Sequence, residues 1–232
     1  ARAILFLLAI MNLNGPMNGP RMMNRERIGI FGGTFDPPHI GHQILAMEAY
    51  AEMSLDALFW VLAPQPPHKQ GKQITPLEIR IEMVKEAIHE DPVFKFSSVD
   101  INRPGPHYVV DTLRIFRSLY PNAELSFIMG GDSLHDLATW HAARQFVDAC
   151  DRFGVMRRPG EVIELREIEK DLPGISPKIH FIEAPLLEIS SNQIRKLVSE
   201  GKPFRYYLPK AVYEIVVRQG LYLQAENNNQ DK

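Results

Sequence analysis

The chain contains very little cysteine: Cys150 is the only one among 232 residues. A single thiol cannot form an internal disulfide, so the fold has to be held together by its core. Such a composition is typical of proteins that fold in a reducing compartment. We therefore expect a cytoplasmic location.

Charge of one sign is not in excess either, because 26 Lys and Arg balance 28 Asp and Glu to leave a formal net charge of −2. The composition therefore shows no basic excess of the kind that indicates a nucleic-acid partner. The apolar run at 3–11 is too short to span a bilayer. We expect neither nucleic acid nor a membrane as a partner.

The run at 3–11 is similar to the apolar part of a secretion signal, but no clear small-residue cleavage site follows it. A turn-rich stretch, 14–20, comes next. We expect residues 1–26 to form a poorly ordered N-terminal extension. A single domain is predicted over 27–223, and 224–232 is a polar tail.

From residue 27 onward, strand-like apolar runs alternate with amphipathic helical segments. This alternation predicts an α/β fold with a doubly wound, mostly parallel open sheet, and ligands of such sheets bind at the carboxyl ends of the strands. The expected strands are 27–31, 57–63, 94–100, 125–130, 152–156 and 178–183, and the expected helices are 40–53, 76–89, 108–119, 133–149, 191–200 and 210–219.

The most informative stretch is Gly32–His42, which follows the first strand and precedes the first helix. Glycines let a backbone approach a ligand closely, and the free N–H groups of a helix start attract anions. His39 and His42 are three residues apart, so they share a face of the first helical turn. The alternative is a tight turn with two surface histidines. The pattern favours a phosphate-binding site.

A second polar stretch, Ile189–Arg195, also begins a helix. Ser190 and Gln193 have the spacing of a capping box, which is a purely structural interpretation. Hydroxyls and free N–H groups at a helix start also bind phosphate, and Arg195 lies one turn further on. Taken together with the first stretch, this pattern indicates a second half of the phosphate site.

The two stretches GGTFDPPHIGH and ISSNQIRK resemble the His-x-Gly-His and Ile-Ser-Ser-Thr-x-x-Arg motifs of the nucleotidyltransferase superfamily. Within it, the chain is similar to the bacterial nicotinate-nucleotide adenylyltransferases over about 27–223. The segments that support this resemblance are Pro67–Lys69, Arg103–Tyr108 with Asp111–Leu113, Gly130–Leu134 with Trp140, Arg158–Gly160, and Tyr207–Pro209 with Gly220–Tyr222. It implies a Rossmann-like nucleotidyltransferase fold with a small C-terminal helical part.

The resemblance also implies the reaction. The phosphate of nicotinate mononucleotide attacks the α-phosphorus of ATP in line, without a covalent enzyme intermediate, to give nicotinate adenine dinucleotide and pyrophosphate. Mg²⁺ accompanies ATP as the cofactor, and the protein supplies no metal ligand. The partners are thus ATP and the mononucleotide, and the protein is a monomer or a homo-oligomer. Because the attacking phosphate is already ionised, catalysis rests on positioning and charge stabilisation.

The resemblance carries over to single residues. His39, His42 and Arg195 are expected to be catalytic and to stabilise charge on the departing pyrophosphate. The residues expected to bind ATP and its phosphates are Gly33, Thr34, Phe35, Gly131, Asp132, Ser190 and Ser191, those of the first turn through backbone N–H groups. The residues expected near the mononucleotide are His68, Lys69, Val109, Trp140 and Arg158.

Some of these residues also have plainer interpretations. Asp132 can serve as a helix cap, and Trp140 can be a core aromatic residue. His68 and Lys69 can belong to an ordinary solvated loop, and Arg157 beside Arg158 is an equivalent candidate for the anion contact.

The sequence also departs from the family pattern. Asn192 replaces the usual threonine of the second motif, Val109 replaces a frequent threonine, and His141 replaces a common tyrosine. The last two concern discrimination between the acid and amide mononucleotides. The alternative functions are adenylyl or cytidylyl transfer to another phosphate, such as nicotinamide mononucleotide or pantetheine phosphate, or non-catalytic nucleotide sensing.

Overall fold

The sheet consists of parallel strands. The computed structural model describes residues 25–65, 74–157, 163–185 and 188–223. Within these ranges one six-stranded sheet runs in the order β3-β2-β1-β4-β5-β6, and every neighbouring pair is parallel. The predicted doubly wound parallel sheet is confirmed. Its strands are β1 (Arg27–Gly33), β2 (Ala57–Leu62), β3 (Phe94–Ser97), β4 (Glu124–Gly130), β5 (Arg152–Met156) and β6 (Ile179–Ile182).

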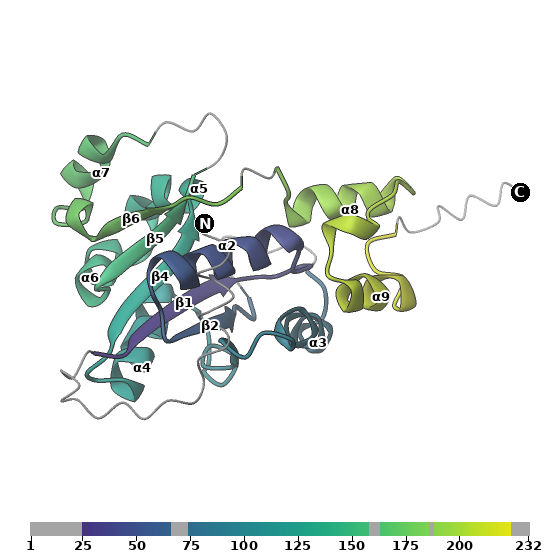
Figure 1. Ribbon diagram of the computed structural model, residues 1–232, viewed down its shortest axis with the longest axis horizontal. Helices are drawn as coiled ribbons and strands as arrows, with labels where there is room; N and C mark the ends of the chain where they lie inside the picture. Colours follow the sequence, from purple (N-terminus) through teal and green to yellow (C-terminus); the bar gives the residue numbers. More distant parts are fainter. Residues whose placement is uncertain (1–24, 66–73, 158–162, 186–187, 224–232) are drawn as a thin grey trace, which may run out of the picture.

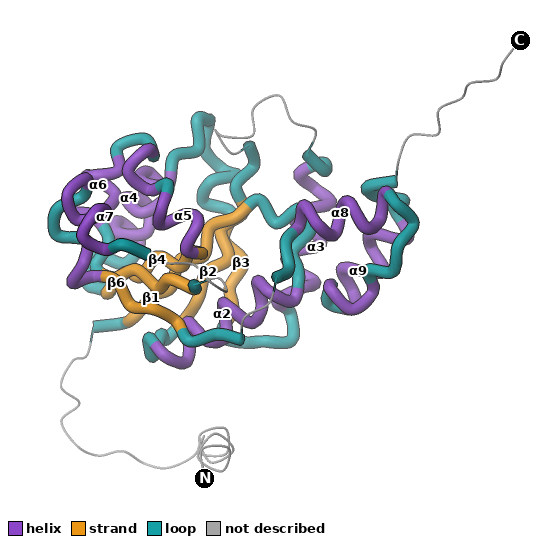
Figure 2. Tube along the Cα trace, turned by 90° about the horizontal axis from the view of Figure 1, so that it is seen from above, coloured by secondary structure: helices purple, strands orange, loops and turns teal. Residues whose placement is uncertain are grey.

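Helices cover both faces of this sheet (Figures 1 and 2). Figure 2 shows α3, α8 and α9 gathered on one side of the strands and α4, α6 and α7 on the other. The helices are α2 (Ile40–Glu52), α3 (Leu77–Ile88), α4 (Val109–Leu119), α5 (Gly131–His135), α6 (Ala143–Ala149), α7 (Leu165–Asp171), α8 (Ser191–Ser199) and α9 (Lys210–Arg218), with 3-10 turns η2 (Leu137–Thr139), η3 (Ser176–Lys178) and η4 (Arg205–Tyr207).

Successive side chains of the strands point to opposite faces and so build two separate cores. In β2, Trp60 packs into the core beneath α2, α3, α8 and α9, and the next residue, Val61, packs into the core beneath α4 and α6. The same alternation relates Phe127 and Ile128 in β4. Central strands buried on both faces have to be apolar throughout, which is why their sequences read as continuous apolar runs.

The direction of strand order reverses between β1 and β4, because β2 and β3 lie on one side of this pair and β5 and β6 on the other. Crevices that bind ligands form at such a reversal, outside the carboxyl ends of the strands. The turn that follows β1 therefore lies where the sequence predicts a ligand site.

The predicted helix 133–149 is wrong as a single element. The chain instead forms α5, η2 and α6, since Trp140 is extended (ψ 150°) and Ala142 has a left-handed backbone (φ 54°). Apolar residues continue at helical spacing through Leu134, Leu137 and Ala143, so the pattern cannot reveal the break. The break leaves Trp140 on a connection rather than on a helix face.

Two further elements differ from expectation. Strand β3 ends at Ser97, three residues before the predicted end, because the chain turns there and Asp100 bonds to the next segment. Helix α7 was not expected, and none of its residues is buried. Its pattern therefore carries little of the apolar periodicity by which helices are recognised.

Most of the predicted extension 1–26 and the whole tail 224–232 lie outside the described residues. The two described residues of the extension are tied to the domain, since Arg25 donates to the carbonyl oxygens of Asn122 and Ala123 and the carbonyl of Glu26 accepts from Glu124. No helix in the described ranges is long and apolar enough to cross a membrane.

Candidate active site

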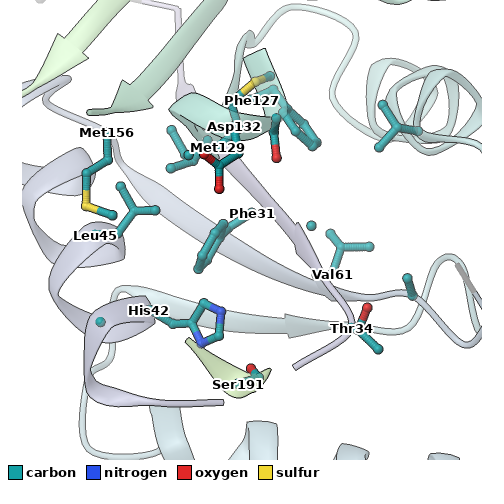
Figure 3. Close-up of a pocket in the computed structure, with 18 of the residues that line it drawn as sticks. Phe31, Thr34, His42, Leu45, Val61, Phe127, Met129, Asp132, Met156 and Ser191 are labelled. Atoms are coloured by element: carbon teal, nitrogen blue, oxygen red, sulfur yellow. The ribbon is translucent and has the colours of Figure 1, made fainter. Parts of the chain in front are cut away.

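A cavity of about 1330 Å³ opens at the carboxyl ends of β1 and β4. Figure 3 draws His42 and Ser191 at one end and Asp132 and Met129 at the other, with Phe31 between them. This volume exceeds that of a typical single-ligand pocket, so the cavity has room for two nucleotides. The predicted site residues that line it are Gly33, Thr34, His39, His42, Val109, Asp132, Trp140, Ser190 and Ser191.

Three of the predicted residues that the structure describes, Phe35, Gly131 and Arg195, do not line this cavity, and both Phe35 and Gly131 are buried. His68, Lys69 and Arg158 lie outside the described residues.

The turn after β1 is shaped by Phe35. This residue is only 2% exposed, has a left-handed backbone (φ 48°), and packs its ring against Phe31 and Trp60. A Cβ at Gly33 would lie 2.7 Å from the Phe35 ring, so only glycine fits there. The side chain of Phe35 therefore anchors the turn from inside, and the proposed phosphate contact concerns its backbone N–H alone.

The two histidines stack on each other at the start of α2, with ring centroids 3.6 Å apart. His39 is 6% exposed, and burial lowers its pKa to about 4, so its imidazole is neutral at neutral pH. Nδ1 of His42 accepts a hydrogen bond from the backbone N–H of His39 at 3.1 Å. Because Nδ1 is the acceptor, Nε2 carries the proton and can donate it to a ligand oxygen.

Gly41 makes this stacking possible. A Cβ at this position would lie 3.1 Å from Nδ1 of His39 and 3.2 Å from its Cε1. A side chain would thus force the His39 ring away from His42. The glycine of the first motif serves the placement of an imidazole as well as access to the cavity.

The N-terminus of α8 meets the N-terminus of α2 across the turn. Oγ of Ser191 donates to the carbonyl of Pro37 at 2.9 Å, and Oγ of Ser190 accepts from the backbone N–H of Gln193 at 3.2 Å. Both helix N-termini carry partial positive charge, so their convergence favours an anion in the cavity.

Arg195 lies beside this junction and is not among the residues that line the cavity. Its guanidinium donates to the carbonyl of Asp36 at 2.6 Å and to the side-chain oxygen of Asn192. In this arrangement Arg195 holds α8 to the turn. Its predicted contact with the triphosphate remains a prediction, because a ligand would have to draw the guanidinium away from these acceptors.

The far end of the cavity is aromatic. Trp140 packs its ring against Phe127 and Phe146, and His141 stacks on Tyr108 with centroids 3.9 Å apart. Tyr108 lies next to Val109, and both line the cavity. Flat rings of this kind suit a planar heterocycle. Trp140 is only partly buried, so it is both a core aromatic residue and a cavity wall.

Sequence reasoning missed the support beneath this aromatic end. Asp100 is 5% exposed and accepts from Oγ1 of Thr112 at 2.8 Å and from Nε of Arg103 at 3.0 Å. Arg103 in turn donates to the carbonyl oxygens of Pro106 and Tyr108. The only signal in the sequence is the polar stretch 103–108, and nothing local shows which acceptors it reaches.

Arg157, the alternative to Arg158, does line the cavity and lies 3.7 Å above the ring of Phe181. Among the described residues, no cluster of three or more His, Cys, Asp or Glu has the arrangement of a metal site. Asp132 is an exposed carboxylate in the cavity wall.

Comparisons with known proteins agree with this geometry. The cytidylyltransferase-like family matches residues 30–197. A probable nicotinate-nucleotide adenylyltransferase of Thermomicrobium roseum is 43% identical over 201 residues, which cover 87% of this chain and 94% of that protein. A probable nicotinate-nucleotide adenylyltransferase of Thermus thermophilus is 40% identical over 196 residues, which cover 84% of this chain and 99% of that protein.

Solved structures share the fold. The nicotinic acid mononucleotide adenylyltransferase of Plasmodium falciparum complexed with NaAD superposes with a TM-score of 0.71 at 22% identity, over 85% of this chain and 98% of that one. Its complex with APC gives a TM-score of 0.70. At this level of identity the likeness shows a common architecture.

Proposed function

This chain belongs to the nicotinate-nucleotide adenylyltransferases of the cytidylyltransferase-like family, and we propose that it transfers the AMP group of ATP to nicotinate mononucleotide. The products are nicotinate adenine dinucleotide and pyrophosphate, and the reaction belongs to NAD biosynthesis. The relatives that carry this name match the chain over most of both lengths.

One observation of the structure supports the proposal: the same cavity has one end whose helix N-termini and hydrogen-bond donors favour phosphate, and another end lined by aromatic rings. The first is formed by the turn at Gly33, by His42 and by the start of α8, and the second by Tyr108 and Trp140. In a mononucleotide the phosphate and the heterocycle likewise lie at opposite ends. The cavity therefore suits a mononucleotide whose phosphate faces the turn and whose ring faces Tyr108 and Trp140, and its volume of about 1330 Å³ leaves room for a second nucleotide.

Catalysis in this site rests on placing two phosphates in line and stabilising the charge that develops on pyrophosphate. The Nε2–H group is the hydrogen-bond donor of the His42 imidazole toward such an oxygen, since Nδ1 accepts from a backbone N–H. His39, held neutral by burial, can bind phosphate only as a hydrogen-bond donor. No general base is needed, because the attacking phosphate is already an anion.

Mg²⁺ enters the proposal as the companion of ATP, where it neutralises triphosphate charge. The carboxylate of Asp132 lies in the cavity wall, where it can interact with a divalent cation that arrives with ATP. The expected partners are thus Mg²⁺-ATP and nicotinate mononucleotide, and the expected location is the cytoplasm.

The decisive experiment follows pyrophosphate release by the purified protein with ATP and Mg²⁺. Nicotinate mononucleotide should support turnover, and chelation of Mg²⁺ should abolish it. H42N should lower kcat by about 100-fold, the effect of removing one donor to a developing oxyanion. The matched control is H135A, because His135 is 85% exposed and does not line the cavity.

Parallel reactions with nicotinamide mononucleotide and pantetheine phosphate test the alternatives. A higher kcat/KM with either would replace the proposed substrate. Absence of pyrophosphate release with all three would refute adenylyl transfer to these substrates and leave cytidylyl transfer and nucleotide sensing as the alternatives.

A further inference from the structure

Arg80 is a charged residue buried in a place that the catalytic assignment does not explain. It lies in the first turns of α3 and is 2% exposed. Burial lowers the pKa of its guanidinium, and the negative charge of Asp36 opposes that shift. Arginine is rarely buried to this extent unless its donors are satisfied.

The guanidinium of Arg80 donates four hydrogen bonds, and all four acceptors are backbone carbonyls. Nε bonds Thr75 at 2.9 Å, one terminal nitrogen bonds both Thr34 at 3.1 Å and Ala63 at 2.9 Å, and the other bonds Pro64 at 2.6 Å. One planar fork thus joins the turn after β1, the segment after β2 and the start of α3.

Two of the four acceptors lie at the end of the cavity where phosphate is proposed to bind. Thr34 and Ala63 line it, and the backbone N–H of Ala63 donates to the carbonyl of Gly33 at 2.9 Å. Arg80 itself does not line the cavity. It therefore lies behind the turn and can act on a ligand only through the backbone that it holds.

The orientation of the Thr34 carbonyl has a direct consequence for anion binding. In a trans peptide the C=O of one residue and the N–H of the next point in opposite directions. Because Arg80 holds the Thr34 carbonyl, the N–H of Phe35 points away from the guanidinium. A carbonyl free to turn into the cavity would present a negative dipole to the phosphates.

A core role alone does not require this residue. Buried ionic groups contribute little net stability compared with well-packed apolar side chains of similar volume. In the described part of the chain, Arg80 donates its hydrogen bonds to backbone carbonyl oxygens and not to a carboxylate. Its geometry instead suits the control of several carbonyls at once, which the fork of arginine can achieve and the single ammonium of lysine cannot.

We propose that Arg80 is a positioning residue for the adenylyl transfer: it holds the carbonyls of Thr34 and Ala63 away from the phosphates and, through the Thr34 peptide, fixes the orientation of the backbone N–H of Phe35. The inference rests on the proposed function for its kinetic consequence. The backbone effect itself is independent of the reaction.

The test compares R80K, R80Q and the control R117K. Arg117 also bonds a backbone carbonyl, that of Ala123 at 2.6 Å, and an acidic partner, Asp151, at 2.6 Å. Ala123 precedes β4, so Arg117 lies at the amino end of this strand, whereas the cavity lies at its carboxyl end. R117K therefore removes guanidinium hydrogen bonds to a backbone carbonyl and a carboxylate without changing a residue that lines the cavity.

Two readouts are needed: steady-state kinetics and hydrogen exchange of the turn 33–36 in the absence of substrate. R80K should lower kcat by about 10- to 100-fold, as expected for a small misplacement of reacting groups, with the KM for ATP changed by less than about threefold. Exchange of the turn should accelerate in R80K and R80Q. In R117K, kcat and exchange of the turn should match the wild type.

Wild-type kcat together with wild-type exchange of the turn in R80K would overturn the inference. So would equal loss of kcat in R80K and R117K, or loss of cooperative folding in both R80K and R80Q, since Arg80 would then serve general stability. Lack of pyrophosphate release by the wild type would instead refute the proposed function, and hydrogen exchange would still decide whether Arg80 holds the turn.

Discussion

At the scale of single residues, the two histidines of the first motif are held in different ways. His39 is buried and its pKa is lowered to about 4, whereas His42 is oriented by a hydrogen bond from the backbone to Nδ1. His39 is thus neutral at neutral pH, and we expect a phosphate at this turn to be bound through helix dipoles and N–H groups.

The burial of His39 predicts a dependence of stability on pH. Its folded pKa of about 4 lies below the value of 6.5 for an unperturbed histidine. The unfolded chain thus binds a proton first as the pH falls, so stability is complete above about pH 6.5 and is lost toward pH 4. We expect the titration of His39 to lower the free energy of unfolding by about 2 kcal/mol at about pH 5. The loss should reach about 3 kcal/mol once His39 is fully protonated in the folded state.

Urea unfolding at about pH 7.5 and about pH 5 measures this loss, and H39N is the matched variant because asparagine does not titrate and caps helices well. The loss of unfolding free energy between the two pH values should be about 2 kcal/mol smaller in H39N than in the wild type. Equal losses in the two proteins would mean that the pKa of His39 is not lowered by folding.

At the scale of elements, the first turn of α8 combines structure and chemistry. Ser190 caps the helix through its hydroxyl, Ser191 ties the helix to Pro37, and both line the cavity. A cap and a phosphate ligand both use a serine hydroxyl at a helix start. The sequence pattern alone therefore cannot separate the two roles.

Substitutions of Ser190 separate them. Alanine at a cap costs about 1 kcal/mol, whereas glycine costs only a few tenths of a kcal/mol. If the hydroxyl also binds phosphate, S190A and S190G should both lower kcat/KM by about tenfold, the effect of one lost hydrogen bond, although only S190A loses stability. Thermal unfolding and initial rates measure the two effects.

The control for this series is S199A at the other end of α8, where Oγ donates to the carbonyl of Lys196 and does not line the cavity. S199A should leave the rate unchanged. Wild-type kinetics in S190G would show that Ser190 is a helix cap only.

At the scale of the whole molecule, Asp36 joins the C-terminal helical part to the sheet. It is 5% exposed, its carboxylate accepts from the hydroxyl of Tyr222 at 2.7 Å, and its backbone carbonyl accepts from Arg195. Helix α9 also packs against α3. The part of the chain after β6 is thus bonded to the turn that follows β1.

This connection predicts that the molecule unfolds as one unit. Y222F removes a partly buried hydrogen bond to a carboxylate and should lower the free energy of unfolding by about 1 to 2 kcal/mol. Far-UV circular dichroism and fluorescence of Trp60 and Trp140 should follow a single shifted transition in urea.

Y206F serves as the matched control, because Tyr206 is 88% exposed, and it should leave the midpoint unchanged. Two separate transitions in the wild type would show that the C-terminal part is an independent unit.

The sheet was predictable from the sequence to a large extent, because buried parallel strands have to be apolar on both faces. The break at Trp140–Ala142 was not, since apolar spacing continues across it. Of the site, the glycine turn, His39, His42 and Ser190 could be found from local motifs. Arg80 could not, since its acceptors lie up to 46 residues away in the chain.

The sequence by itself determined the alternation of strands and helices. It also determined where α2 and α8 begin, with the residue types expected of a phosphate site, because both features depend on short-range periodicity and on residue type. Tertiary structure decided which groups meet. It buried His39, turned Arg195 onto the carbonyl of Asp36, and placed Arg80 behind the turn. Such choices depend on contacts between distant segments and on desolvation, which no local pattern records.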